Sequence, residues 1–515
     1  MPSYAPSVRL GIDFGTTHTV AAVVDRGNYP IVSFEWGDVV PSMVAARIGD
    51  GQLRFGHDAL LLERDPEWVA LRSLKRLVAS SGPLTEVSVG PHRFRVADLL
   101  TRYLARLRVD IVERSNAGVG PNEVLTVAAS VPANASNNQR FLTLDAFHQA
   151  GFDVVTLLNE PSAAGFEYAH RFRNMLTSRR EYVIVYDLGG GTFDSSLIHM
   201  SGPLNQVVTS SGVSRLGGDD MDDAIAALVL DKIGQHAIDA GQRRQLLEEC
   251  RLQKEAVGPN TRRMVIDLEP LGLEPLVLRM EEVYDACAPL VAATVEAMDE
   301  TLQNSRDNDG GSVGFGELAG IYVVGGASSF PLVPRRLKEQ FGAHRVRRSP
   351  HPFAATAIGL ATYLDEEKGF ELADCLTRHF GVWREADTGQ AVTFDPIFGK
   401  DAPLPARGDP PLEAWRRYRS AHNIGHFRFV ECVRLKDGQP DGGVVPWDEI
   451  LFPIDPELRE RRDLSGVAVV RSHEYDVEER YRCDAAGIFE VTVSVPDHEF
   501  ARHYVIGRSS PAGVA

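Results

Sequence analysis

Apolar and polar residues alternate with two different patterns along the chain, and the change between them divides it in two. Up to about residue 362, short apolar runs typical of buried strands alternate with longer segments of helical periodicity, which predicts an α/β fold. One helix is expected over "NASNNQRFLTLDAFHQAG", ending at Gly151, and another near Pro331. Strands are expected at 8–14, 18–25, 124–130, 182–187, 192–198 and 321–324.

From about residue 363 the pattern predicts a small β domain. A charged connection is followed by the Pro/Gly-rich loop "GKDAPLPARGDPPLEAW" and then by strand-like runs. In "GIFEVTVSV", Phe489, Val491, Val493 and Val495 alternate with polar positions, as in a half-buried antiparallel strand. The segment "RSSPAGVA" is expected to be a frayed tail.

One plan occurs twice in the α/β part. "LGIDFGTTHTVAAV" and "VIVYDLGGGTFDSSLI" both read as strand, Asp, apolar residue, Gly, Thr and second strand. Consecutive N–H groups in a glycine turn form an anion-binding nest, and a threonine hydroxyl adds a donor. Carboxylates beside phosphates imply a divalent cation between them, and Mg²⁺ suits few direct ligands. We interpret the pair as two phosphate-binding hairpins facing one cleft, with Asp13, Asp187 and Asp194 near the cation. Two unrelated glycine-turn hairpins are the alternative.

Two further glycine pairs agree with a nucleotide site. Gly217 and Gly218 begin an amphipathic helix, where free N–H groups and the helix dipole can accept a phosphate. A helix start capped by the acidic residues 219–223 is the alternative. Gly325 and Gly326 follow a strand and precede a helix, so a flat ring or a ribose could lie against their backbone.

Charge and composition exclude several classes of protein. The net charge of −17 disfavours a nucleic-acid partner, and no apolar run is long enough for a membrane span. The N-terminus lacks the pattern of a signal peptide. Five scattered cysteines without a CxxC pair fit a reducing compartment, so a cytoplasmic protein is expected.

The motifs, in this order, resemble those of a known family. "GIDFGTTHTVAAV", "VYDLGGGTFDSSLI" and "IYVVGGASSFPLV" resemble the signature stretches of the seventy-kilodalton heat-shock chaperones, members of the actin-like ATPase superfamily. "LRSLKRLVAS", "SVPANASNNQR" and "LLNEPSAAGFEYA" agree, and the resemblance covers about residues 8–362. It implies a two-lobed actin-like (ribonuclease-H-like) nucleotide-binding domain at 1–365 and a linker at 366–386. A β-sandwich resembling a truncated peptide-binding domain would follow at 387–507, then a tail at 508–515, without an α-helical lid.

The resemblance also implies roles for individual residues. Lys75 would contact the γ-phosphate and help to place the attacking water, with Glu160, Thr192 and Asp187 as the other catalytic residues. Pro132 and Arg140 would relay the nucleotide state between domains. Asp13, Asp187 and Asp194 would hold Mg²⁺ largely through water. The residues expected to bind ATP or ADP are Gly15, Thr16, Thr17, Gly189, Gly190, Gly191, Thr192, Gly217, Gly218, Lys254, Gly325, Gly326, Ser329 and Phe353.

The base-binding residues depart from the family pattern. Lys254 is kept, but Arg251 stands where an acid belongs, Gly258 where a serine belongs and Ser329 where a stacking arginine belongs. Phe353 replaces an aspartate, so Phe353 or Arg251 would stack on the base instead. The linker "FELADCLTRHFG" is not the family's leucine-rich run, which predicts weak, fast peptide binding with modest nucleotide coupling.

The function expected from these features is slow, Mg-dependent ATP hydrolysis that drives a chaperone-like switch. Unfolded or client polypeptides would be the partners, together with a co-chaperone or an exchange factor. A non-hydrolysing nucleotide sensor or scaffold is one alternative. A sugar-kinase-like phosphotransferase of the same superfamily is the other, and "NEPSAA" and the C-terminal β domain argue against it.

Overall fold

The computed structural model describes most of the chain and divides it into two compact units. The first unit joins Met1–Arg76, Ala105–Asn134 and Phe152–Glu371, and the second joins Leu77–Leu104, Ala135–Gly151 and Leu372–Ala515. The residues described are 7–79, 81–82, 84–120, 123–133, 135–177, 179–234, 238–305, 313–386, 391–406, 408–442, 444–461 and 463–506. The expected tail at 508–515 lies outside them.

A five-stranded mixed sheet forms one half of the first unit. Strand β1 pairs antiparallel with β2 and parallel with β9, giving the order β10-β9-β1-β2-β3. In β1 the alternating residues Leu10, Ile12 and Phe14 are fully buried, which fixes the face that the strand turns to the core. The strands are β1 (Ser7–Phe14), β2 (His18–Val23), β3 (Val40–Pro41), β9 (Val124–Val131) and β10 (Asp153–Asn159).

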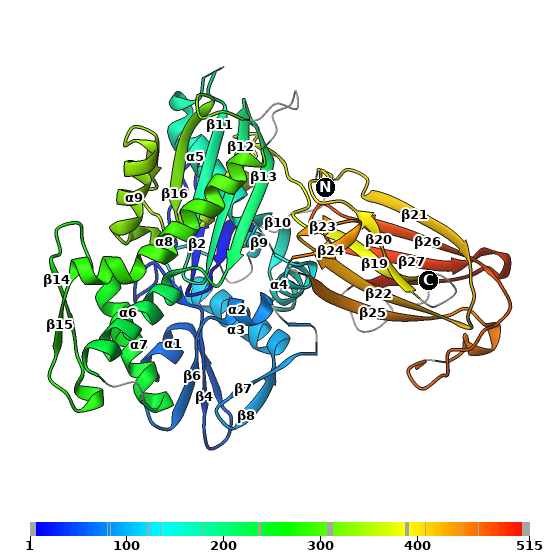
Figure 1. Cartoon of the computed structure of the whole chain (residues 1–515), viewed down its shortest axis with the longest axis horizontal. Coiled ribbons are helices and arrows are strands. Elements are labelled where there is room, and N and C mark those ends of the chain that lie inside the picture. Colours follow the sequence, from blue (N-terminus) through cyan, green and yellow to red (C-terminus); the bar gives the residue numbers. More distant parts are fainter. Residues whose placement is uncertain are drawn as a thin grey trace. The chain divides into compact units, whose positions relative to one another are not determined.

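A six-stranded sheet repeats this arrangement in the other half of the first unit. Strand β11 pairs antiparallel with β12 and parallel with β16, giving the order β17-β16-β11-β12-β13-β18 (Figure 1). The two repeated motifs of the sequence therefore form the same antiparallel hairpin in the same place of two equivalent sheets. The strands are β11 (Tyr182–Leu188), β12 (Thr192–Ser201), β13 (Leu204–Ser214), β16 (Leu318–Val324), β17 (Val346–Arg348) and β18 (Glu371–Ala373).

Helices α5 and α10 cross between the two sheets at very short range. A Cβ on Gly359 of α10 would lie 1.8 Å from the carbonyl oxygen of Ala163 on α5, so the two backbones touch. Gly11 of β1 meets Ala357 of α10 in the same way, at 2.2 Å from its carbonyl oxygen. The longer helices are α3 (Val96–Arg114), α5 (Glu160–Phe172), α6 (Gly218–Lys232), α7 (Ala240–Glu255), α8 (Met280–Gln303), α9 (Leu332–Phe341) and α10 (Ala355–Leu364).

Short elements complete the α/β part. They are α1 (Gly56–Leu61), α2 (Leu74–Ala79), β4 (Val44–Arg47), β5 (Leu53–Phe55), β6 (Trp68–Leu71), β7 (Glu86–Val89), β8 (His92–Arg95), β14 (Arg263–Ile266), β15 (Leu276–Arg279) and the 3-10 turns Arg173–Met175, Glu269–Leu271 and Gly326–Ser329. No described helix is long and apolar enough to cross a membrane. All five cysteines are buried and unpaired.

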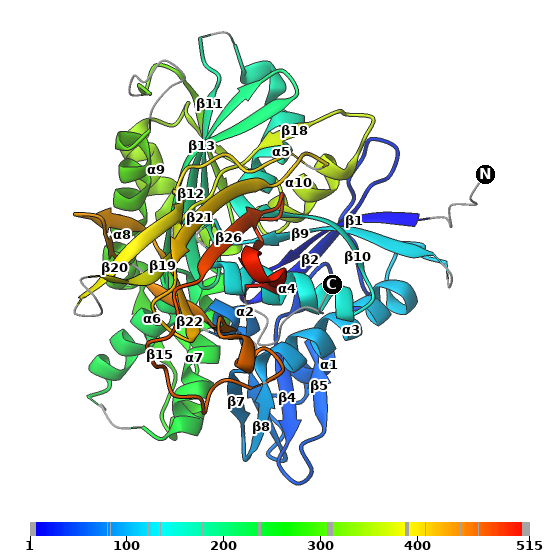
Figure 2. The same ribbon diagram turned by 90° about the vertical axis from the view of Figure 1, so that its right-hand side faces the viewer.

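Two four-stranded antiparallel sheets share one core in the second unit, with the orders β20-β19-β22-β25 and β21-β26-β27-β28 (Figure 2). The alternation predicted for 489–495 is confirmed, because every second side chain of β27 is buried. Strand β19 lies inside the stretch expected to be a linker, so the sheet begins earlier than residue 387. The strands are β19 (His379–Ala386), β20 (Ala391–Phe398), β21 (Leu412–Arg419), β22 (Ile424–Cys432), β23 (Arg434–Lys436), β24 (Gln439–Asp441), β25 (Val445–Pro453), β26 (Asp476–Cys483), β27 (Phe489–Val495) and β28 (Phe500–Val505).

An ionic cluster joins the two sheets of the second unit. Arg384 of β19 donates two hydrogen bonds, of 2.9 and 2.7 Å, to the fully buried carboxylate of Glu479 on β26. The same guanidinium reaches Asp395 at 2.8 Å, and Arg416 of β21 pairs with that carboxylate at 2.9 Å. Bidentate pairs of this kind fix geometry as well as charge, so the cluster sets how the two sheets face each other.

Helix α4 (Asn137–Gln149) belongs to the second unit. Its first N–H group, at Asn137, donates to the buried carboxylate of Glu431 at 3.0 Å, which suits the positive end of a helix dipole. The indole of Trp447 donates to Asn138, and Arg140 donates to the carbonyl of Ala486 at 3.2 Å. A helix that precedes the second unit's strands by more than 200 residues is therefore part of the same compact unit.

Candidate nucleotide-binding site

The first hairpin turns between β1 and β2. A Cβ on Gly15 would lie 2.3 Å from the carbonyl oxygen of His18, so only glycine allows this turn to close. Asp13 is the next-to-last residue of β1, and its carboxylate accepts a hydrogen bond of 2.7 Å from the Ser130 hydroxyl on β9. The turn thus brings one carboxylate and the two threonines Thr16 and Thr17 to the edge of the first sheet.

The second hairpin turns between β11 and β12. The Gly189 N–H donates to the Thr192 carbonyl at 3.0 Å, which closes the glycine turn. Asp187 and Asp194 are cross-strand partners in the register of the two strands. The same combination of carboxylates, glycines and threonine that the first hairpin presents is repeated at the edge of the second sheet.

The two hairpins meet. A Cβ on Gly190 would lie 1.8 Å from the hydroxyl oxygen of Thr17, and a Cβ on Gly191 would lie 2.6 Å from the methyl group of Thr16. Glycine at both positions therefore allows the turn of one sheet to pack against the turn of the other. The hypothesis of one shared cleft required this convergence, and the geometry of the first unit contains it.

The backbone around Gly217 and Gly218, where α6 begins, is hydrogen-bonded to the second hairpin. The N–H groups of Gly218 and Asp219 donate to the carbonyls of Gly189 and Gly190 at 3.0 and 2.8 Å, and the Gly217 N–H donates to the Asp220 carboxylate at 2.8 Å. These donors thus have partners within the chain. Their contact with a phosphate stays a prediction, whereas their support of the glycine turn was not foreseen.

Lys75 lies buried beside the hairpins and pairs with Glu160, the first residue of α5. Burial alone favours the neutral amine, but Glu160, Asp13 and Asp194 outweigh it and raise the pKa of Lys75. The ammonium group is therefore charged at neutral pH.

The segment that carries Lys75 is fixed from the second sheet's side. Ser73 adopts a left-handed conformation, with φ of 59°, and its hydroxyl donates to Asp219 of α6 at 3.2 Å. Arg76 pairs with Asp220 at 3.1 Å and donates to the Gly191 carbonyl at 3.3 Å. No local pattern in the sequence indicated these long-range partners of Arg76.

The carboxylates around the hairpins repel one another. Burial and Glu160 raise the pKa of Asp13 to about 6, and burial together with Glu160, Asp194 and Asp13 raises the pKa of Asp187. Among the described residues no three His, Cys, Asp or Glu side chains are placed to ligate a metal directly. Acidic oxygens that are near one another without forming a closed cage fit a Mg²⁺ ion held largely through water.

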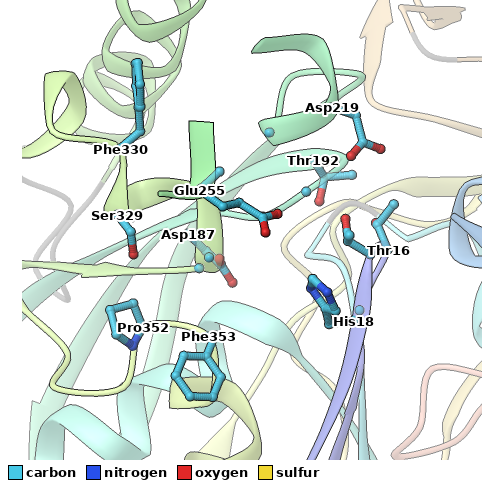
Figure 3. A pocket seen from close by; sticks show the side chains of 18 of the residues that line it. Thr16, His18, Asp187, Thr192, Asp219, Glu255, Ser329, Phe330, Pro352 and Phe353 are labelled. Carbon is cyan, nitrogen blue, oxygen red and sulfur yellow. The ribbon is translucent and has the colours of Figure 1, made fainter. Parts of the chain in front are cut away.

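A cavity of about 360 Å³ lies in front of the hairpins, which is within the usual size of small-molecule sites. Figure 3 shows Thr16 and His18 on one side of it and Ser329, Pro352 and Phe353 on the other. The predicted residues that line it are Asp13, Gly15, Thr16, Thr17, Lys75, Glu160, Asp187, Gly189, Gly190, Thr192, Gly218, Lys254, Gly325, Gly326, Ser329 and Phe353.

The pair Gly325 and Gly326 serves two purposes. Gly325 has φ of +84°, and a Cβ there would lie 2.4 Å from a carboxylate oxygen of Asp187, so this glycine packs against the second hairpin. Gly326 faces open space, because a Cβ there would have no atom within 4 Å. Of these two glycines, Gly326 is therefore the one that leaves open space in the cavity.

Most polar side chains at the base-binding residues already have partners. Lys254 donates to the Gly218 carbonyl at 2.6 Å and pairs with Asp222, also at 2.6 Å. Arg251 pairs with Glu248 at 2.5 Å, and the Ser329 hydroxyl accepts from a guanidinium nitrogen of Arg348 at 2.5 Å. Phe353 is 38% exposed and lines the cavity.

Several residues that line the cavity were missed by sequence reasoning, among them His18, Asp222 and Glu255. Burial and the nearby charges of two arginines lower the pKa of His18 to about 4, so its imidazole is neutral. Burial raises the pKa of Asp222 to about 7 although its lysine partner opposes the shift. His18 lies within the first hairpin motif and Asp222 within the acidic stretch 219–223, but neither pattern indicated that these side chains would line the cavity.

The two residues predicted to relay nucleotide state lie in different units. Pro132 is buried and follows β9 in the first unit, whereas Arg140 is on α4 in the second. Burial lowers the pKa of Arg140, opposed by nearby carboxylates such as Asp374 and Glu431. A role for either residue in coupling stays a prediction.

Comparisons with known proteins agree with the motifs. The model of the family "Hsp70 protein" matches residues 74–376, more than half of the chain. A chaperone protein HscA homolog of Vibrio cholerae is 32% identical over 94% of this chain and 75% of its own length. A chaperone protein HscA homolog of Laribacter hongkongensis is 30% identical over 68% of this chain, which spans 57% of that relative.

These matches confirm, at the level of the family, the predicted resemblance to heat-shock chaperones, which are ATPases. Because the family model matches more than half of the chain, and because the Vibrio cholerae relative is 32% identical and is covered over 75% of its length, the chain belongs to the Hsp70 family.

Proposed function

We propose that the chain binds Mg-ATP in the cavity and hydrolyses it slowly, and that this drives a chaperone switch that binds unfolded or client polypeptides. The observation that carries the proposal is the contact between Gly190 and Thr17, which brings two Asp-Gly-Thr hairpins to one cavity. On this proposal the first unit contains the two lobes of an actin-like nucleotide-binding domain, which the equivalence of its two sheets supports.

Phosphoryl transfer to water depends on positioning and on neutralising charge, and the residues around the cavity supply both. The hairpin N–H groups and the hydroxyls of Thr16, Thr17 and Thr192 would bind phosphate oxygens. Mg²⁺, when bound near Asp13, Asp187 and Asp194, supplies positive charge that neutralises the phosphates.

Lys75 and Glu160 are suited to the water that attacks the γ-phosphate. The charged ammonium of Lys75 can donate to a phosphate oxygen or to the water, and the Glu160 carboxylate that pairs with it can accept a proton from that water. Because both groups are buried, bulk water competes little for them.

Several finer statements belong to the same proposal. The nucleotide-binding domain would span about 1–365, a connection would follow from 366, and the β-sandwich that binds polypeptide would begin with β19 at His379. A cytoplasmic location and dependence on a co-chaperone or an exchange factor would accompany this function. The relatives, each named as a chaperone, support the binding of polypeptides in this proposal.

Phosphate release by the full chain, with ATP and Mg²⁺ and no other acceptor, tests the proposal. We expect slow turnover that Lys75→Ala and Thr192→Val each reduce at least 100-fold, while Lys338→Ala, at an exposed helix position, changes nothing. Tight ATP binding without release would favour a nucleotide sensor instead. Release only after a sugar is added would favour a phosphotransferase.

A further inference from the structure

The cavity has two chemically different ends. One end holds the hairpins, Lys75 and the carboxylates, and suits the phosphates and the cation. At the other end, on the side away from Thr16 and His18 in Figure 3, lie Pro352 and Phe353; the apolar groups of Val257 and Ala327 and the bare backbone of Gly326 also line the cavity. A nucleotide has the same division between a charged and an aromatic part, so its base would lie at the apolar end.

Phe353 is the aromatic surface available to a base. Its ring is 38% exposed and faces the cavity together with Pro352 (Figure 3). The neighbouring Phe330 also lines the cavity but offers little free surface to a base, because its side chain is buried and its ring packs against Tyr284, with ring centroids 5.5 Å apart. Gly326 also lines the cavity, and the open space in front of its backbone leaves room for a flat ring.

The polar side chains at this end are poorly suited to read the edge of a base. Lys254, Arg251 and Ser329 are each held by partners within the chain, at 2.5–2.6 Å. Glu255 lines the cavity and has no hydrogen bond or ion pair among the residues that the structure describes. Its carboxylate is an exposed acceptor on a long side chain, which can accept from the amino group of adenine, guanine or cytosine alike.

We propose that this site accepts nucleoside triphosphates with little discrimination among amino-bearing bases, because the base is held by stacking on Phe353 and not by hydrogen bonds that read its edge. The inference rests on the proposed nucleotide function and adds the substrate class. Stacking on an aromatic ring tolerates any base, since every base has a π-face. Discrimination of 10⁴-fold or more requires fixed polar partners for the base edge.

Competition binding to the full chain with Mg²⁺ tests the inference, using ATP, GTP, CTP and tripolyphosphate, which lacks a base. We expect dissociation constants for ATP, GTP and CTP within tenfold of one another. Phe353→Ala should weaken all three by a similar factor, about 5- to 100-fold, and leave tripolyphosphate unchanged. Phe315→Ala is the matched control, because Phe315 is 43% exposed and does not line the cavity.

A preference for ATP of more than tenfold, or nucleotide affinity unchanged by Phe353→Ala, would overturn the inference while leaving ATP hydrolysis intact. If neither tripolyphosphate nor any nucleotide binds, the proposed function fails and the inference fails with it. Gly326→Ala provides a second variant. Its added methyl group meets no protein atom within 4 Å, so the chain should fold normally. We expect this variant to bind nucleotides more weakly than the wild type and to bind tripolyphosphate equally well.

Discussion

A single methyl group at Gly190 tests whether the two hairpins meet in the protein. In Gly190→Ala the new Cβ would lie 1.8 Å from the hydroxyl oxygen and 3.0 Å from the Cβ of Thr17. The backbone at Gly190 is not left-handed, so the perturbation is the clash alone. Overpacking of this kind costs about 1–3 kcal/mol, because the hairpins must separate to relieve it.

The double variant with Thr17→Ala isolates this contact. Removing the hydroxyl leaves the Thr17 Cβ at 3.0 Å, which the neighbouring backbone can accommodate by a few tenths of an ångström. We expect Gly190→Ala to cost about 1–2 kcal/mol less in the Thr17→Ala background than in the wild type, a coupling typical of residues in direct contact.

Native-state amide hydrogen exchange of the β11 and β12 peptides reports the free energy of local opening of these two strands, so it measures the destabilisation at the hairpin itself. Gly189→Ala is the matched control in the same turn, because its Cβ would lie 3.5 Å from the Thr192 carbonyl oxygen, an ordinary contact. Effects of Gly190→Ala and Thr17→Ala that add within about 0.5 kcal/mol would refute convergence of the hairpins.

Three further predictions follow from buried or paired charges. The pKa of His18 is lowered to about 4, so the unfolded chain binds more protons and stability is lost as pH falls from about 6.5 to about 4. His18→Asn should remove a loss on the order of 3 kcal/mol in thermal melts across that range, and an unchanged pH profile would contradict the shift. Glu479→Ala deprives Arg384 of its bidentate partner and should destabilise the second unit by about 3–5 kcal/mol in calorimetry, whereas a cost below about 1 kcal/mol would mean that the pair is solvated. Glu248→Ala removes its 3.0 Å pair with Arg72 and its 2.5 Å pair with Arg251, each worth about 0.5–1 kcal/mol, and should speed release of a fluorescent nucleotide about two- to fivefold in stopped flow; equal rates would mean that these pairs do not slow nucleotide release.

The hairpins were predictable because their information is local. Asp13, Gly15 and Thr16 stand within four residues of one another, and the same order of residue types recurs at Asp187, Gly189 and Thr192. The strands around them were found from their apolar runs, and the parallel neighbours β9 and β16 follow from the α/β alternation. Sequence therefore identified both glycine turns and suggested that they share one cleft.

The partners of the site were not predictable, because they join residues far apart in the chain. Arg76 pairs with Asp220, more than 140 residues away in the sequence. The N–H groups of Gly218 and Asp219 donate hydrogen bonds to the carbonyls of Gly189 and Gly190. A glycine pair at a helix start looks the same whether its donors serve a ligand or the chain itself. For the same reason no pattern assigned α4 to the unit that contains Glu431.

The crossing of α5 and α10 has a mechanical consequence. Where the backbone at Gly359 touches Ala163, no side chain can yield, so the two helices cannot be pressed closer together. We therefore expect any rotation of one large sheet relative to the other to pivot near this contact. The displacement would be least at the contact and greatest at the rim of the cavity. A small rotation at a contact without reactive groups would thus produce a large change in the width of the opening through which the proposed nucleotide enters.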